Sequence, residues 1–130
     1  MKVKIYGAGS IGNHLANASR QMSWSVDICD IDAVALERTK NDIYPSRYKK
    51  WDNEIRLFEN NKSPKEYYDL IFIGTPPNTH IQLALEALEQ SPKAVIIEKP
   101  LCCPDLGDVF KLQEISNQKK IPIFVGYDHV

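Results

Sequence analysis

Short apolar runs alternate with amphipathic segments along the whole chain. A short, continuous apolar run bounded by turn residues predicts a strand that is buried on both faces of a parallel sheet. The clearest example is the run at residues 70–73, which ends at Gly74. On this basis the sequence predicts strands at residues 3–6, 25–29, 55–58, 70–73, 94–97 and 122–125.

The segments between these runs carry apolar residues at helical spacing. Residues 11–22 place Ile11, Leu15 and Ala18 on one face, and residues 81–88 repeat the i, i+3, i+4, i+7 pattern of an amphipathic helix. Other helices are expected from Ala33 to about Asp42 behind an Asp32 cap, at the capping box Ser63-Pro64-Lys65-Glu66, and after Asp105 with Leu106, Val109 and Phe110 facing inward. Residues 43–53 have no clean period.

Alternating strands and helices favour an α/β fold, in which helices cover both faces of a parallel sheet. Six strands form two mononucleotide-binding halves, so we expect a Rossmann-type doubly wound sheet with strand order 3-2-1-4-5-6. The 130 residues suit one domain, at residues 1–130.

Composition excludes several classes of protein. Sixteen lysines and arginines against 17 aspartates and glutamates leave no basic excess for a nucleic-acid partner. No apolar run approaches a membrane span, and the N-terminus lacks a signal-peptide pattern. The cysteines Cys29, Cys102 and Cys103 form no CxxC pair, so we expect reduced thiols, no metal site and a cytoplasmic location.

A glycine motif joins the first predicted strand to the first helix. It reads Gly7-Ala8-Gly9-Ser10-Ile11-Gly12. In a dinucleotide-binding turn, Gly7 permits the tight turn, Gly9 lets the backbone approach a pyrophosphate and Gly12 lets helix and strand pack closely. The phosphates then lie over the free N–H groups of the helix, so this turn, with Ser10 and Ile11, is the predicted cofactor-binding element. A plain strand-to-helix turn is the alternative.

Two acids follow the second predicted strand. Asp30 is placed to accept hydrogen bonds from an adenosine ribose diol, and a carboxylate there repels a 2′-phosphate. The next basic residue is Arg38, so the sequence favours NAD over NADP. Asp32 is better explained as a helix N-cap than as a ligand contact.

Two further segments lie where strands end, at the edge of the sheet where ligands bind. Residues 74–80, Gly-Thr-Pro-Pro-Asn-Thr-His, hold the chain extended, and His80 can bond a ligand or neighbouring backbone; a capped helix start is the alternative. The segment Glu98-Lys99-Pro100 places a lysine at the end of a buried strand. Desolvation there can lower the pKa of the lysine towards a value useful for acid–base catalysis, and Glu98 can hold the lysine by hydrogen bonding. An ordinary solvated lysine is the alternative. The basic and aromatic residues 47–51 are expected to form a solvated face.

These motifs, with Val125-Gly126-Tyr127, resemble the N-terminal domain of the Gfo/Idh/MocA oxidoreductases, the glucose–fructose oxidoreductase and inositol dehydrogenase family. The resemblance covers essentially the whole chain. It implies NAD(P)-dependent oxidation or reduction of a sugar, cyclitol or related polyol. Lys99 matches a family lysine that lies near the reacting carbinol and assists proton transfer or substrate orientation. The Lys99–Pro100 bond resembles the family's often-cis peptide. Thr75, Pro76 and His80 match cofactor-lining positions of the family. Glu98 and Pro100 are also expected to bind the cofactor.

Two departures from the family pattern qualify this expectation. The chain continues as Asp128-His129-Val130 where many members have a polar pair and then arginine. The resemblance also implies a C-terminal substrate domain with a catalytic histidine, and these 130 residues do not contain one. We therefore expect this chain to be the cofactor-binding half of a homo-oligomeric enzyme. Alone, this half is expected to be inactive and could be a monomer. The alternatives are a non-catalytic NAD-sensing module and a structural Rossmann domain with a degenerate site.

Overall fold

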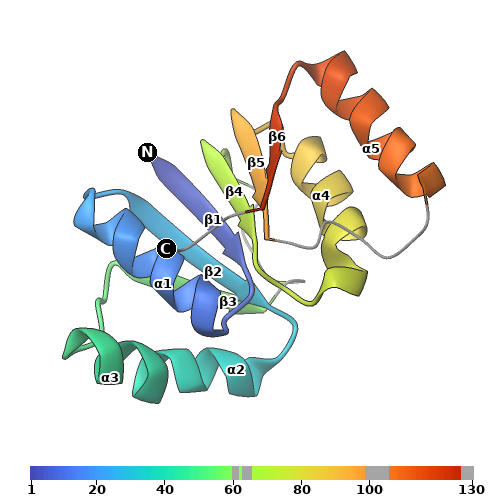
Figure 1. The fold of residues 1–130 in the computed structure, drawn as a ribbon. Helices are drawn as coiled ribbons and strands as arrows, with labels where there is room; N and C mark the ends of the chain where they lie inside the picture. The colour runs from blue at the N-terminus through green and yellow to red at the C-terminus, as the bar shows by residue number, and fades with distance from the viewer. Residues whose placement is uncertain (60–61, 63–65, 99–105, 127–130) are drawn as a thin grey trace.

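A single twisted sheet organises the molecule (Figure 1). The structure, a computed structural model, describes residues 1–59, 62, 66–98 and 106–126. The sheet has six strands in the order β3-β2-β1-β4-β5-β6, and every neighbouring pair is parallel, which confirms the predicted fold. The strands are β1 (Lys2–Tyr6), β2 (Ser25–Asp30), β3 (Ile55–Glu59), β4 (Leu70–Ile73), β5 (Ala94–Ile97) and β6 (Ile123–Val125).

Helices cover opposite faces of the two halves of the sheet. The helical elements are α1 (Ser10–Gln21), α2 (Ala33–Arg38), the π-helical stretch η1 (Thr39–Ile43), α3 (Tyr44–Tyr48), the 3₁₀ turn η3 (Pro77–Thr79), α4 (His80–Glu89) and α5 (Leu106–Lys119). Residues of α1, α2 and α3 form one apolar cluster with β1, β2 and β3, while α4 and α5 form the second with β4 and β5. The switch between the halves lies between the neighbouring strands β1 and β4. These two parallel strands end at the same edge of the sheet (Figure 1).

The second predicted helix is longer and less regular than its sequence suggests. Asp32 caps α2 through its carboxylate, which accepts the Val34 N–H at 2.9 Å, as predicted. The chain then continues through η1 and α3 to Tyr48, across a stretch with no clean apolar period. Pro45 lies in the first turn of α3, directly after the π-helical stretch, where its missing N–H leaves one backbone hydrogen bond unmade.

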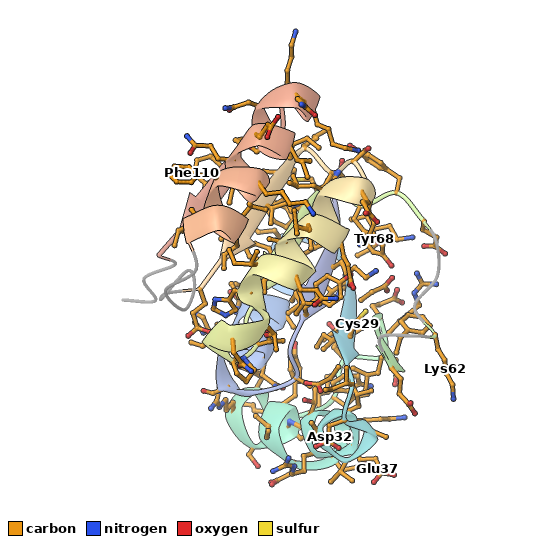
Figure 2. The ribbon with its side chains drawn as sticks, turned by 90° about the vertical axis from the view of Figure 1, so that its right-hand side faces the viewer. Cys29, Asp32, Glu37, Lys62, Tyr68 and Phe110 are labelled. Carbon is orange, nitrogen blue, oxygen red and sulfur yellow. The ribbon has the colours of Figure 1, made fainter. Side chains whose placement is uncertain are left out.

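Of the residues predicted to face inward on the last helix, Val109 is half-buried, but the position predicted for Phe110 is wrong. Phe110 is 66% exposed and projects from the outer side of α5 (Figure 2). Leu112 and Ile115 pack against the core instead. Helical spacing identifies residues that share a face, but packing decides which face is buried. The capping box and Asp105 fall largely outside the described residues, although Glu66, which is described, is not helical.

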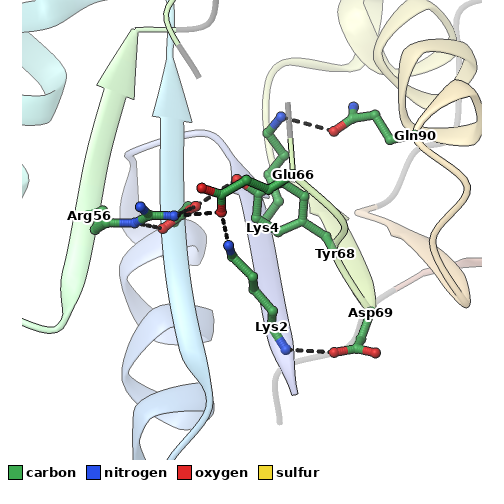
Figure 3. A network of polar contacts seen from close by, with 8 residues as sticks. Lys2, Lys4, Arg56, Glu66, Tyr68, Asp69 and Gln90 are labelled. Atoms are coloured by element: carbon green, nitrogen blue, oxygen red, sulfur yellow. Dashed lines mark hydrogen bonds and ion pairs between the residues drawn. The ribbon is translucent and has the colours of Figure 1, made fainter. Parts of the chain in front are cut away.

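A buried carboxylate ties β2 to β3 and to the segment before β4. Asp27 is 1% exposed, and both of its oxygens accept hydrogen bonds at 2.8 Å from the Arg56 guanidinium. The fully buried Tyr68 donates its hydroxyl to Asp27 at 2.6 Å. Glu66 adds ion pairs to Arg56 and Lys2 (Figure 3). The pairing satisfies a charge that would be costly to bury alone.

A buried lysine extends this network along β1. The Lys4 ammonium lies 5.2 Å from the Tyr6 ring centroid and 5.0 Å from that of Tyr68, and it donates to Gln90 Oε1 at 3.0 Å. Burial lowers the pKa of Lys4, and burial raises the pKa of Tyr6 to about 12. Gln90 is the C-cap residue of α4, so this hydrogen bond joins β1 to the end of α4 (Figure 3).

Candidate functional site

A cleft of about 850 Å³ opens at the carboxyl ends of β1, β2 and β4. Its volume lies in the range of small-molecule and cofactor sites. The glycine turn, the start of α2, the turn after β4 and one face of α4 form its walls. The lining residues are Gly7, Ala8, Gly9, Asp30, Ile31, Asp32, Ala35, Arg38, Ile43, Gly74, Thr75, Pro76, Asn78, Thr79, Gln82, Leu83 and Glu86.

The three motif glycines have different surroundings. Gly7 has a φ of +113°, and a Cβ there would lie 2.7 Å from the Gly74 carbonyl oxygen. A Cβ on Gly12 would overlap the Gly7 carbonyl oxygen, so Gly12 allows α1 to begin directly against the end of β1. A Cβ on Gly9 would meet nothing within 4 Å. The space beside Gly9 is therefore open, and a side chain there would occupy the cleft and not the protein interior.

The N-terminus of α1 offers hydrogen-bond donors to this open space. Gly9 is the N-cap residue, and no side chain caps the helix. The first turn carries no acidic residue. Helix N-termini bind anions because the first N–H groups lack helical partners and the helix dipole favours negative charge. A diphosphate fits this position by charge and by the absence of a side chain on Gly9.

Asp30 links the glycine turn to the end of β2. One carboxylate oxygen accepts the Ala8 N–H at 2.9 Å, and the other accepts the Asp32 N–H at 2.9 Å. Each oxygen of an ionised carboxylate can accept two hydrogen bonds, so both retain capacity for a diol. Asp30 thus holds the turn and also presents an acceptor to the cleft.

Side chains within the turn after β4 fix its shape. The Thr75 and Thr79 hydroxyl oxygens are 2.6 Å apart, and the Thr79 hydroxyl donates to the Pro76 carbonyl at 2.7 Å. Thr79 is the N-cap residue of α4, but its side chain makes no capping bond. The fully buried His80 lies behind the turn, where Nε2 is 2.6 Å from the Thr75 carbonyl oxygen. His80 supports the turn from outside the cleft, whereas Thr75 and Pro76 line it.

The segment after β5 reaches the same edge of the sheet. The Glu98 N–H donates to the Ile73 carbonyl at 3.0 Å, and Glu98 Oε2 is 3.9 Å from the Cβ position of Gly74. Glu98 therefore lies beside the end of β4. Lys99 and Pro100 lie outside the described residues. Of the other predicted site residues, Ser10, Ile11 and Gly12 form the first turn of α1 and do not line the cleft.

Several lining residues were not predicted from the sequence. Ile31 is 79% exposed, although it is apolar and lies between two acids. Its position directly after β2 was the available signal, since the same strand-end rule located Asp30. Gln82, Leu83 and Glu86 share one face of α4, and only the helix orientation shows that this face meets the cleft.

In residues 1–59, 62, 66–98 and 106–126, no three His, Cys, Asp or Glu side chains cluster in a way that would hold a metal ion. No helix within the described part of the chain is both long and apolar enough to cross a bilayer.

Solved structures share this fold over most of the chain. A probable oxidoreductase, yhhX, superposes with a TM-score of 0.69 at 21% identity, covering 96% of this chain and 35% of that one. L-Tryptophan dehydrogenase from Nostoc punctiforme gives 0.64 at 12% identity, with 95% and 32% covered. A conserved hypothetical protein from Pyrococcus furiosus gives 0.59 at 15% identity, with 98% and 94% covered. The chain thus spans about a third of the first two proteins.

Comparison by sequence is more specific. No curated protein matches the chain. Residues 1–127 match the family model of the Gfo/Idh/MocA proteins, described as an oxidoreductase family with an NAD-binding Rossmann fold. That match covers nearly the whole chain and agrees with the strand order, the glycine turn and the position of the cleft. The chain therefore belongs to the Gfo/Idh/MocA oxidoreductase family and is an NAD-binding Rossmann domain.

Proposed function

We propose that this domain binds NAD for hydride transfer to or from the carbinol carbon of a sugar, cyclitol or related polyol. The observation that carries the cofactor assignment is the open space at Gly9, which lies over an acid-free helix N-terminus and beside Asp30. The substrate class rests on the family resemblance of the strand-end motifs.

The lining residues divide the cleft into regions that suit the parts of a dinucleotide. The N–H groups at Gly9 and Ser10 would hold the diphosphate, and Asp30 would accept the adenosine ribose hydroxyls. Ile31, Ala35 and Leu83 provide apolar walls for the adenine. The nicotinamide half would then extend along the Thr75-Pro76 turn. When bound, the cofactor supplies hydride chemistry, while the protein supplies placement and the proton path.

Charge in the cleft favours NAD over NADP. Asp30 and Asp32 both line it, and a 2′-phosphate beside either carboxylate would be repelled. Arg38 lines the same cleft and is the cation that would compete with this preference. Two backbone N–H groups, those of Ala8 and Asp32, hold the Asp30 carboxylate in its position at the cleft.

Lys99 is the proposed proton-transfer residue. It follows Glu98, which is bonded to the end of β4 beside the cleft. Oxidation of a carbinol removes a hydride from carbon and a proton from oxygen, and a lysine amine near that oxygen can take the proton. We propose that the remaining substrate contacts come from polypeptide outside these 130 residues. The whole enzyme would then be larger, homo-oligomeric and cytoplasmic.

Calorimetric titration of this chain with NADH and with NADPH tests the cofactor assignment. Tighter binding of NADH is expected. Tighter binding of NADPH would indicate that Arg38, and not Asp30, determines the cofactor preference. Failure to bind either nucleotide would contradict the assignment of a cofactor site. The role of Lys99 requires the full-length enzyme, in which Lys99→Ala should abolish turnover and leave the Kd for NADH unchanged. Unchanged turnover would contradict that role, and NADH binding without any turnover in the wild type would favour an NAD-sensing module.

A further inference from the structure

A buried pair of polar side chains lies directly beneath the glycine turn. Asn13, on α1, and Thr39, at the junction of α2 and η1, are both 0% exposed. The Asn13 Nδ2 group is 3.1 Å from Thr39 Oγ1. Neither residue lines the cleft, and neither belongs to the glycine motif.

Both side chains direct their donors at carbonyl groups of the turn. Thr39 donates its hydroxyl to the Ala8 carbonyl at 2.8 Å. Asn13 Nδ2 donates to the Gly9 carbonyl at 2.8 Å and approaches the Ala8 carbonyl at 3.3 Å. The Asn13 backbone N–H also donates to the Gly9 carbonyl, at 3.0 Å. The carbonyl oxygens of Ala8 and Gly9, which lie on either side of the Gly9 Cα atom, are thus each held by two donors.

The orientation of the Asn13 amide has a cost. Its Oδ1 atom is the buried side-chain acceptor for which the described part of the chain provides no hydrogen-bond partner. A buried polar atom without a partner is destabilising. The amide is nevertheless held with its donor towards the turn, which indicates that the contacts to the turn determine its orientation.

Carbonyl orientation determines where the turn presents its donors. A trans peptide is planar, so its C=O and N–H groups point in opposite directions. When the Ala8 carbonyl is held inward, the Gly9 N–H must point outward, and the Gly9 carbonyl likewise fixes the Ser10 N–H. Glycine lacks the steric restriction that would otherwise limit such a peptide to one orientation.

We propose that Asn13 and Thr39 are positioning residues that hold the glycine turn with its N–H groups directed at the cofactor diphosphate. This inference rests on the proposed cofactor function for its consequence, but not for the contacts themselves. It also gives a role to the irregular segment from Thr39 to Tyr48, which delivers the Thr39 hydroxyl beneath the turn.

Thr39→Val, Thr39→Ser and Tyr44→Phe test the proposal. Valine keeps the shape of threonine and removes the hydroxyl, whereas serine keeps the hydroxyl. The buried Tyr44 is the matched control, because its hydroxyl also bonds α1, at 3.3 Å from Asn17 Oδ1, but makes no hydrogen bond to the turn. The measurements are amide hydrogen exchange over residues 7–13 without nucleotide and the Kd for NADH.

Thr39→Val should increase exchange at the Gly7, Ala8 and Asn13 amides, which are bonded at 2.8, 2.9 and 3.0 Å, by several-fold. It should raise the Kd for NADH about tenfold, the effect of one lost hydrogen bond of about 1.4 kcal/mol. Thr39→Ser and Tyr44→Phe should stay within about twofold of the wild type in both measurements.

Two results would overturn the proposal. One is a Thr39→Val variant with wild-type exchange in the turn, and the other is an equal effect of Tyr44→Phe, which would show a general loss of packing. If the wild type fails to bind NADH, the proposed function fails, while the exchange measurement still decides for or against the positioning role.

Discussion

A methyl group added at Gly9 should separate cofactor binding from folding. In the free protein the new Cβ meets nothing within 4 Å, and Gly9 has φ −89° and ψ −159°, an extended conformation open to alanine. Replacing a glycine restricts the unfolded chain and stabilises by about 0.4–1 kcal/mol. Alanine is a poorer N-cap than glycine, which costs a similar amount. The free energy of unfolding of Gly9→Ala should therefore stay within about 1 kcal/mol of the wild type.

Binding should change much more. The methyl group enters the space from which a diphosphate approaches the Gly9 and Ser10 N–H groups. A displacement of about 1 Å weakens two charge-assisted hydrogen bonds, each worth about 1.5 kcal/mol or more. The sum of about 3 kcal/mol corresponds to a loss of affinity on the order of 100-fold.

Gly12→Ala is the matched comparison. Its Cβ would overlap the Gly7 carbonyl oxygen, which is backbone and cannot move without shifting α1 or β1. Overpacking of this kind costs about 1–3 kcal/mol or more, so this variant should lose stability. Urea unfolding and NADH titration of both variants measure the contrast. A Gly9→Ala protein that binds NADH like the wild type, or that unfolds as readily as Gly12→Ala, would refute the reasoning.

Asp30→Ser should shift the ratio of NADPH to NADH affinity towards NADPH by about tenfold, measured by titration, and an unchanged ratio would contradict the specificity role. Tyr6→Phe loses the bond from Gln90 and about 1 kcal/mol at pH 7. Because burial raises the folded pKa of Tyr6 from 10.0 to about 12, the stability of the wild type is complete below pH 10 and falls by up to about 3 kcal/mol as the pH rises towards and through 12. The advantage of about 1 kcal/mol over Tyr6→Phe at pH 7 should therefore be lost in alkaline urea titrations. Arg56→Ala should cost about 2–4 kcal/mol in the same assay, since the buried Asp27 carboxylate loses a two-point partner, and a loss below 0.5 kcal/mol would count against that role.

The sheet was predictable because its strands carry local signals. Residues 70–73 and 94–97 were located to the residue, since a buried parallel strand is continuously apolar and ends at a turn. Strands β1 and β2 are less regular, as each buries a charged residue, Lys4 and Asp27. No local pattern shows that these two side chains lie at one register position, because that depends on the pairing of two strands.

The site was predictable only where it coincides with strand ends. The glycine turn, Asp30 and the Thr75-Pro76 turn follow from the topology. Gly7, Ala8 and Gly9 line the cleft together with Asp30, Thr75 and Pro76, whereas the remainder of the glycine motif does not. Thr39 could not be found in this way, because its contact with Ala8 spans 31 residues and depends on the irregular course of η1. His80 shows the opposite limit, since a motif places it near the site and only the structure shows that it bonds the Thr75 carbonyl.

The pairing of β1 with β4 has a consequence for the order in which the domain folds. Gly7 donates its N–H to Cys29, and Gly74 donates to Tyr6, so the turn at the end of β1 is enclosed by strands from both halves of the chain. A contact between residues so distant in sequence forms only after a large entropic cost of loop closure, and such topologies fold slowly. A nascent chain that ends before β4 can pair β1 with β2, yet it lacks one wall of the cleft. Ligand capture during synthesis must therefore wait for the second half of the sheet, and until then the edge of β1 is open to incorrect pairing.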